Sequence, residues 1–438
     1  MAEFTEKITE EEAIPTKNLP EVLIADILSR LPVKSLLKFR CVCKTWCALI
    51  ADPAFVKEHL NRSLASNSNL SLIFRRCALF SVDLDTCEQR AAVELDHPLK
   101  SPHLATEVLG SCNGLLCISN SDEDILLWNP SIRRHHKLPI TPIEFPVRFD
   151  SPRLIVYGLG YDPTTDDYKL VRVVQFYGDS EYSCDSEVKV YSLRTNSWRR
   201  IRDMPYHLSY ERGFGVLNNS WRKIRDMPYH LSYKRGYGVL ANYALHWVAM
   251  RETGRDTAST FIVSFDLQDE YYREIPLPDF VDDEFHMTVG VLGGQLCLLC
   301  NFFRVRVEVW VMKEYGVRDS WLKQFSIEQP DVISSFMFVR PICYSKNGDV
   351  ILDKDSEAPL LLYDSLRERV RNLRIRGAPD RMETEICVGS LVPLNAKDGT
   401  EQPAMMKKHR KHKKRRFMEQ SWFLFLLGLA DVGSAELW

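Results

Sequence analysis

Apolar residues near the start of the chain follow the spacing of a short helix. Residues 19–32 read LPEVLIADILSRLP, and the apolar positions with helical spacing are Leu23, Ile24, Ile27, Leu28 and Leu31. Pro20 suits the first turn of a helix and Pro32 ends the helix, while Val22 is expected to point away from the main stripe. The pattern predicts a helix with more than one apolar face.

More helices are predicted directly after this one. Two short patterns contain Val33, Leu36 and Leu37, then Val42, Trp46, Leu49 and Ile50. Asp52 can cap a following helix that carries Phe55, Val56 and Leu60. A chain of fewer than roughly 40 residues usually needs disulfides, metals or a partner protein to fold. A three-helix unit of about 35 residues is below that size. Part of its apolar surface must therefore be covered, either by the rest of the chain or by another protein.

The same segment resembles an F-box, and we place this domain at residues 18–62. The resemblance rests on the opening LPEVLIADILSRLPVKSL and on RCVCKTW. In that family the outward apolar face binds a Skp-type adaptor of a cullin-based ubiquitin ligase. The resemblance therefore implies adaptor binding by Leu19, Pro20, Leu23, Ile24, Ile27, Leu28, Leu31, Pro32, Val33, Leu36, Val42, Cys43 and Trp46.

After residue 100 the pattern changes to short apolar runs separated by Gly, Asn, Asp and Pro, which is typical of all-β structure. One sequence phrase recurs, and it consists of a strand, a polar turn and a second strand. Its aligned aromatic positions are Trp128, Tyr191, Phe265, Trp310 and Tyr363. Successive aromatic positions are 63, 74, 45 and 53 residues apart. Removing a 23-residue duplicate from the interval of 74 leaves 51, close to the period of about 50 of kelch-like propeller blades.

The duplicate lies within residues 196–241. NSWRRIRDMPYHLSYERGFGVL is followed by NSWRKIRDMPYHLSYKRGYGVL, identical at 19 of 22 positions, so one copy is expected to be surplus. Only the first copy directly follows the strand that ends near Tyr191, and only the second directly precedes the strand ALHW. We therefore predict that Trp198 and Val239 stay in the blades and that the middle loops out, with Trp221 competing for the place of Trp198.

These β phrases resemble the F-box-associated region of plant F-box proteins, notably in GSCNGLLCIS, LLWNPSIRRHHKLP and GLGYDPTTDDYKLVRVV. The resemblance implies an α+β multidomain fold, in which a three-helix F-box precedes a large all-β, propeller-like receptor for the protein to be ubiquitinated. Relatives by phrase act in defence control or pollen recognition. The predicted division is a disordered N-terminus at residues 1–17, a connecting segment at 63–104, the propeller-like domain at 105–395 and a disordered basic tail at 396–438.

Charge adds one candidate signal. The chain has a formal net charge of -2, which argues against a body that binds nucleic acid. KKHRKHKKRR is either a solvated tail or a nuclear-localisation signal made of Lys407, Lys408, Arg410, Lys411, Lys413, Lys414, Arg415 and Arg416. The acidic N-terminus predicts no export, the 12 cysteines are read as reduced thiols, and the apolar run 422–430 is too short for a membrane span. We expect a cytoplasmic or nuclear protein without a membrane partner.

Catalytic and metal motifs find little support. GSCNG at residues 110–114 matches a nucleophile elbow, but the apolar run after it predicts a strand instead of a helix. Cys297 and Cys300 form a C-x-x-C without a second pair, and phosphate-binding glycine motifs are missing. We therefore expect a non-catalytic ligase subunit without metal or cofactor, whose target and target-binding residues stay unknown. Two alternatives stay open, a scaffold that degrades nothing and a propeller enzyme or sugar-binding propeller with a helical appendage.

Overall fold

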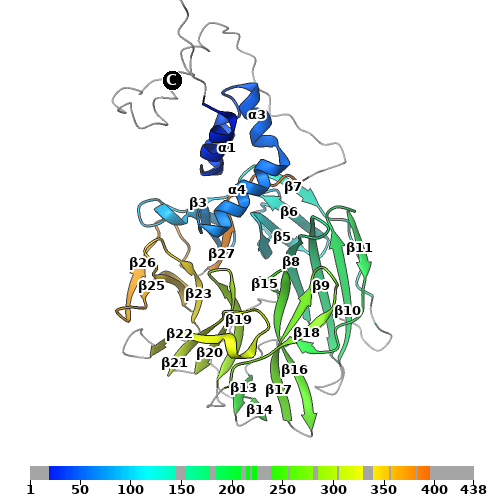
Figure 1. Ribbon diagram of the computed structural model, residues 1–438. Helices are drawn as coiled ribbons and strands as arrows, with labels where there is room; N and C mark the ends of the chain where they lie inside the picture. The colour runs from blue at the N-terminus through cyan, green and yellow to red at the C-terminus, as the bar shows by residue number, and fades with distance from the viewer. Residues whose placement is uncertain are drawn as a thin grey trace, which may run out of the picture.

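The computed structural model describes residues 19–394 except 145, 147–153, 178–183, 209–213, 218–219, 224–237, 255–256, 280–284, 303–304, 329–338, 355–356 and 381. Four helices come first: α1 (Glu21–Ser29), α2 (Val33–Phe39), α3 (Lys44–Ala51) and α4 (Pro53–Ala65). A six-bladed β-propeller follows, and the helices lie at one edge of its ring of blades, with α4 nearest to the strands (Figure 1).

The helices begin where the sequence predicts. Pro20 and Pro32 immediately precede α1 and α2 with φ of -51° and -58°, already near the helical value. Asp52 caps α4, because its Oδ1 accepts hydrogen bonds from the backbone N–H groups of Ala54 and Phe55 at 2.9 and 3.1 Å. The described helical region thus has four helices, of which α4 is the one expected to follow Asp52.

Five blades are built from strands that follow one another along the chain, except that β13 and β14 interrupt blade 4, and the strands are given in order from the axis outward. Blade 2 has β4 (Glu107–Cys112), β5 (Leu115–Ser121), β6 (Asp124–Asn129) and β7 (Arg134–Lys137). Blade 3 has β8 (Leu154–Asp162), β9 (Asp167–Tyr177), β10 (Cys184–Ser192) and β11 (Ser197–Arg200). Blade 4 has β12 (His207–Leu208) and β15 (Val239–Ala241) beside β16 (Ala244–Gly254), then β17 (Thr257–Asp266) and β18 (Tyr272–Ile275). Blade 5 has β19 (His286–Leu292), β20 (Gln295–Phe302), β21 (Arg306–Met312) and β22 (Trp321–Glu328), and blade 6 has β23 (Val339–Tyr344), β24 (Val350–Lys354), β25 (Glu357–Asp364) and β26 (Arg369–Leu373).

Blade 1 joins the two ends of the domain. It consists of β1 (Leu70–Arg75), β2 (Leu79–Asp83) and β3 (Val93–Glu94), and β1 pairs with β27 (Glu383–Val388), which supplies the strand next to the axis. The expectation of a connecting segment at residues 63–104 is therefore wrong, since most of it forms α4 and blade 1. The physical reason is closure: β2 pairs one edge of β1, and the backbone groups on the other edge are paired only when the last strand of the domain returns to it.

The recurring aromatic residues occupy equivalent positions, as the alignment predicts, and the structure places all of them on the third strand of their blades. Trp128 is on β6, Tyr191 on β10, Phe265 on β17, Trp310 on β21 and Tyr363 on β25. Four of them are buried and Trp310 is half-buried. Each repeat of the phrase is thus one blade, and the packing of its third strand requires the large side chain.

The two ends of the duplicated segment lie in the blades as predicted, but its middle is not wholly looped out, because β12 of the first copy pairs with β16 of blade 4. Trp198 pairs with Tyr191 across β11 and β10, and Val239 pairs with His246 across β15 and β16. Between them β13 (Phe214–Leu217) and β14 (Ser220–Lys223) form a separate two-stranded hairpin, outside the blades, across the junction of the two copies. Trp221 therefore pairs with Val216 instead of replacing Trp198.

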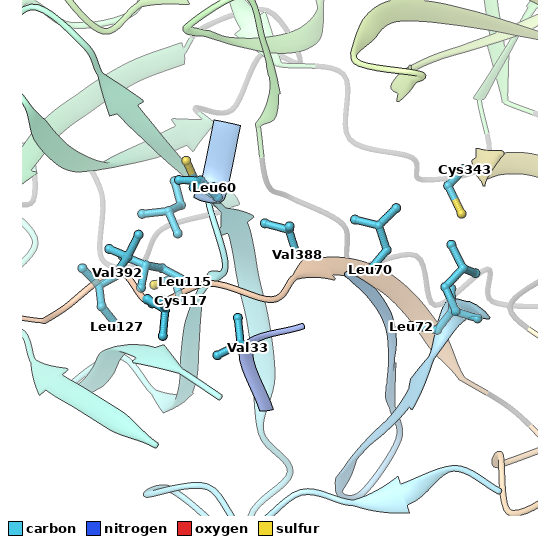
Figure 2. Close-up of a cluster of buried hydrophobic side chains, with 14 of the residues drawn as sticks. Val33, Leu60, Leu70, Leu72, Leu115, Cys117, Leu127, Cys343, Val388 and Val392 are labelled. Carbon is cyan, nitrogen blue, oxygen red and sulfur yellow. The ribbon is translucent and has the colours of Figure 1, made fainter. Parts of the chain in front are cut away.

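One hydrophobic core joins the helices to the propeller. Val33 and Leu60 from the helices belong to the same buried cluster as Val388 and Val392 from the end of the domain (Figure 2). The other labelled members are Leu70, Leu72, Leu115, Cys117, Leu127 and Cys343. The helical region and the propeller are thus packed as one unit.

Polar contacts hold the same junction. The backbone N–H of Gly389 donates to the carbonyl oxygen of Asn69, just after α4, at 2.7 Å. The buried side chain of Asn129 on blade 2 donates to the carbonyl oxygens of Ser390 and Val392 at 3.2 and 3.0 Å. The segment after β27 therefore contacts both the start of blade 1 and blade 2 beneath the helices.

Candidate functional site

The first helix presents an exposed apolar surface. On α1, Val22 is 79% exposed, Leu23 48% and Ile27 37%, and Pro20 before it is also exposed. Large apolar side chains on one exposed helix face are typical of a surface that another protein covers. We call Pro20, Val22, Leu23 and Ile27 the α1 apolar surface.

The structure divides the thirteen residues assigned to adaptor binding into three groups. Pro20, Leu23, Ile27 and Pro32 are exposed. The half-buried ones are Leu19, Ile24, Leu31, Val42, Cys43 and Trp46. The last three, Leu28, Val33 and Leu36, are only 1%, 5% and 0% exposed.

For the three buried residues, direct contact with an adaptor is the wrong assignment. Leu28, Val33 and Leu36 belong to the core that joins the helices to the propeller, so they hold the surface in place. Val22 is the residue that the sequence analysis missed. The sequence contained a signal for Val22, because an apolar residue outside the main apolar stripe indicates a second apolar face on the helix.

Contacts between α1 and α4 hold the α1 apolar surface in position. Arg62 on α4 forms an ion pair with Asp26 on α1 at 2.7 Å, and Arg30 contacts the same carboxylate. Hydrogen bonds from Arg30 and Arg62 lower the pKa of Asp26. The ring of His59, fully buried on α4, lies 2.9 Å from the carbonyl oxygen of Leu31, and burial lowers its pKa.

The third helix is positioned by a thiol and an aromatic pair. The Sγ atom of Cys43 accepts a hydrogen bond from the backbone N–H of Trp46 at 3.4 Å and caps α3. The ring of Trp46 packs edge-on against Phe39, with centroids 5.6 Å apart. Trp46 is thereby held half-buried at the surface of the helical region.

The two motifs considered for catalysis or metal binding, GSCNG and the C-x-x-C, lie in a turn and in the core. Cys112 is the buried last residue of β4, and Asn113 and Gly114, with φ of 52° and 82°, form a tight turn into β5. The strand expected after GSCNG is confirmed, and burial raises the pKa of the Cys112 thiol. Cys297 and Cys300 are buried core residues of β20. Among the described residues, no group of three or more His, Cys, Asp or Glu side chains is placed to hold a metal ion.

Comparisons with known proteins agree with this architecture. The F-box domain matches residues 17–58, and the F-box associated beta propeller domain matches residues 69–217 and, in a second form, residues 213–397. The F-box protein CPR1 of Arabidopsis thaliana is 40% identical over 392 residues, which cover 85% of this chain and 88% of that protein. The chain belongs to the F-box proteins with an F-box-associated propeller.

Other F-box proteins are similar over most of the chain. The F-box protein At4g22390 of the same plant is 35% identical, covering 89% of this chain and 95% of that protein. The F-box/kelch-repeat protein At3g23880 is 31% identical, covering 79% and 88%. The solved structure of TolB from Acinetobacter baumannii has a TM-score of 0.38 at 10% identity, covering 76% of this chain and 70% of that chain, which is too low to support an argument.

Three sequence assignments fall outside the described residues. They are the disordered N-terminus at residues 1–17, the basic tail at 396–438 and, within that tail, the candidate nuclear-localisation signal at 407–416. In the part of the chain that the structure describes, no helix is long and apolar enough to span a membrane.

Proposed function

We propose that this F-box protein is the substrate-recognition subunit of an SCF-type ubiquitin ligase. Its α1 apolar surface, together with the half-buried Leu31, Val42 and Trp46, binds a Skp-type adaptor, and a cullin scaffold is reached through that adaptor. The observation that carries this proposal is the exposure of Val22, Leu23 and Ile27 in a chain whose N-terminal helices match the F-box domain.

The propeller holds the target protein in this proposal. In blade 1, β1 starts just after α4 and β27 ends beside Asn69, so the first strand of a blade runs toward the helices. The connections between blades therefore start and end on the opposite face. Loops on a rigid scaffold are the usual place for recognition residues. We place the target there, on the side away from the adaptor.

The shared core supports transfer by proximity. A ligase receptor accelerates ubiquitin transfer by holding the target near the charged conjugating enzyme, without chemistry of its own. A packed junction between the helices and the propeller keeps that separation constant. We also propose a role in defence control, because the β phrases are shared with a plant group that has this role.

The test is co-purification of the full chain with a Skp-type adaptor. The I27D variant should lose the adaptor, because an apolar contact is replaced by a carboxylate that the interface would bury without a partner. L366D is the matched control, since Leu366 is 94% exposed in the turn between β25 and β26. Undiminished adaptor binding by a folded I27D protein would refute the proposal.

A second measurement separates a degrading ligase from a scaffold. Proteins captured by the full chain, with the proteasome blocked, should carry ubiquitin, and the I27D variant should capture the same proteins without that modification. Captured proteins with equal ubiquitin in both cases would contradict the ligase role while leaving target binding intact.

A further inference from the structure

The second and third helices carry only positive charge. In the stretch Val33–Ala51, which contains α2, α3 and the turn between them, no acidic residue is present and the charged residues are Lys34, Lys38, Arg40 and Lys44. All four side chains are exposed. None of them forms an ion pair or a side-chain hydrogen bond with another residue that the structure describes. We call these four residues the α2–α3 basic surface.

The acidic residues elsewhere in the helical region have other contacts. Asp26 and Glu58 form ion pairs with Arg62 at 2.7 and 2.9 Å, and Asp52 caps α4. Glu21 is in the first turn of α1, where the helix dipole favours an acidic side chain. Like charges repel and opposite charges attract, so an anionic segment that covers the α2–α3 basic surface would be stabilised there.

The α2–α3 basic surface surrounds part of the proposed adaptor site. Val42 and Cys43 lie between Arg40 and Lys44 in the sequence, and both are half-buried. The turn is tight, because the backbone N–H of Val42 donates to the carbonyl oxygen of Phe39 at 3.0 Å. A segment that pairs with both Arg40 and Lys44 therefore passes over Val42 and Cys43.

A segment of the opposite charge comes directly before the helices in the sequence. Residues 1–18 contain five glutamates and two lysines, which gives a formal net charge of -3. The glutamates are Glu3, Glu6, Glu10, Glu11 and Glu12. We call residues 3–12 the acidic segment.

The acidic segment is long enough to reach the α2–α3 basic surface. The chain from Glu12 to Leu19 can span up to about 25 Å when extended, at about 3.3–3.6 Å per residue. The helices α1, α2 and α3 have 9, 7 and 8 residues, so each is about 10–14 Å long, and packed helices lie about 8–10 Å apart. The reach therefore exceeds the distance across the helices.

We propose that the acidic segment binds the α2–α3 basic surface of its own chain and thereby competes with the adaptor for Val42 and Cys43. The competition rests on the proposed function, whereas the contact within the chain does not. Exposed ion pairs are individually weak and are screened by salt. Tethering compensates for this weakness, because a short linker gives a local concentration in the millimolar range.

Carbodiimide cross-linking of the full chain tests the contact without the adaptor, because this reagent joins a carboxylate to an amine only where the two side chains touch. We expect residues 10–12 to be joined to Lys38 or Lys44 at low salt. These products should be largely lost in about 1 M salt, where the Debye length is about 3 Å. Glu94 and Lys100 are the positive control, since their side chains lie 2.8 Å apart.

Three results would overturn the proposed contact. They are the absence of products between the acidic segment and the α2–α3 basic surface, products that join the acidic segment to the basic residues 407–416 in their place, and products that join two chains. A mixture of isotope-labelled and unlabelled chains identifies the last case, because only a contact between two chains yields products of mixed label.

Adaptor affinity tests the competition. The variant E10Q/E11Q/E12Q removes three charges from the acidic segment and leaves the helices intact. It should bind a Skp-type adaptor about 2- to 5-fold more tightly than the unchanged chain at low salt, roughly the worth of one exposed ion pair. The gain should disappear at high salt, where the contact is already screened.

The matched control is E107Q/D122N/E123Q, which removes as many charges from exposed positions of blade 2 and should bind the adaptor as the unchanged chain does. Equal adaptor affinity of E10Q/E11Q/E12Q and the unchanged chain would overturn the competition. Adaptor binding by folded I27D would instead refute the proposed function, and the cross-linking result would then decide the contact alone.

Discussion

Deleting residues 218–240 removes one copy of the duplicated segment without changing the strand that it feeds. The deletion joins Val216 and Leu217 to Ala241, which recreates the tripeptide Val-Leu-Ala of β15. It also removes part of the hairpin of β13 and β14, and an isolated two-stranded hairpin is marginally stable at best. We therefore expect the shortened protein to keep blade 4.

The gain in stability follows from the length of the excursion. Leu208 and Val239 both pair with β16, and in the full chain 30 residues lie between them. In the shortened protein Val216 takes the place of Val239, and 7 residues lie between Leu208 and Val216. Loop-closure entropy that scales as (3/2)RT ln n then favours the shortened fold by about 1.3 kcal/mol. The free energy of unfolding should rise by about this amount.

Urea unfolding followed by far-UV circular dichroism measures the difference, with deletion of residues 219–241 as the matched control. The control has the same length, but it places Asn218 where Ala241 is 5% exposed. A buried amide without a hydrogen-bond partner costs about 1–3 kcal/mol, so the control should lose the gain. If the 218–240 deletion unfolds at lower urea than the full chain, or aggregates, residues 218–240 stabilise the propeller and our assignment of them as surplus is wrong.

Three further predictions concern a buried histidine, a buried ion pair and the tail. Burial lowers the pKa of His246 from 6.5 to about 4, so as the pH falls the unfolded chain takes up a proton on this residue before the folded chain does. About 3 kcal/mol of the free energy of unfolding should therefore be lost between pH 6.5 and pH 4. Urea unfolding at a series of pH values measures this loss, and H246Q should flatten that part of the profile. The side chains of Arg172 and Glu187 form an ion pair at 2.8 Å and are at most 3% exposed, so E187Q should destabilise the protein by about 3–5 kcal/mol. D269N, which changes the exposed pair of Asp269 and Arg273, should cost less than about 1 kcal/mol. Equal effects of the two variants in thermal unfolding would contradict this prediction. If residues 407–416 are a nuclear signal, a reporter fused to residues 400–438 should concentrate in nuclei, and a uniform distribution would favour the solvated tail.

Local features of this protein are determined by the sequence alone. Pro20, Pro32 and Asp52 mark helix starts because a fixed φ or a side-chain cap acts on the adjacent turn. The recurring aromatic residues mark equivalent strands in blades 2 to 6, because each phrase contains two strands and the turn between them. The F-box resemblance and the place of Trp198 follow in the same way, from residues near one another along the chain.

The tertiary structure alone decides which apolar residues are covered and how the propeller closes. Ile27 and Leu28 are neighbours on an apolar helix, yet one is 37% exposed and the other 1%, because α4 and the propeller cover only one face. Likewise β1 pairs with β27 more than 300 residues later, and no local pattern in residues 63–104 indicates that partner. Helical and strand periodicity specify faces, whereas burial depends on which distant segment packs against each face, and that choice is made by the whole chain at once.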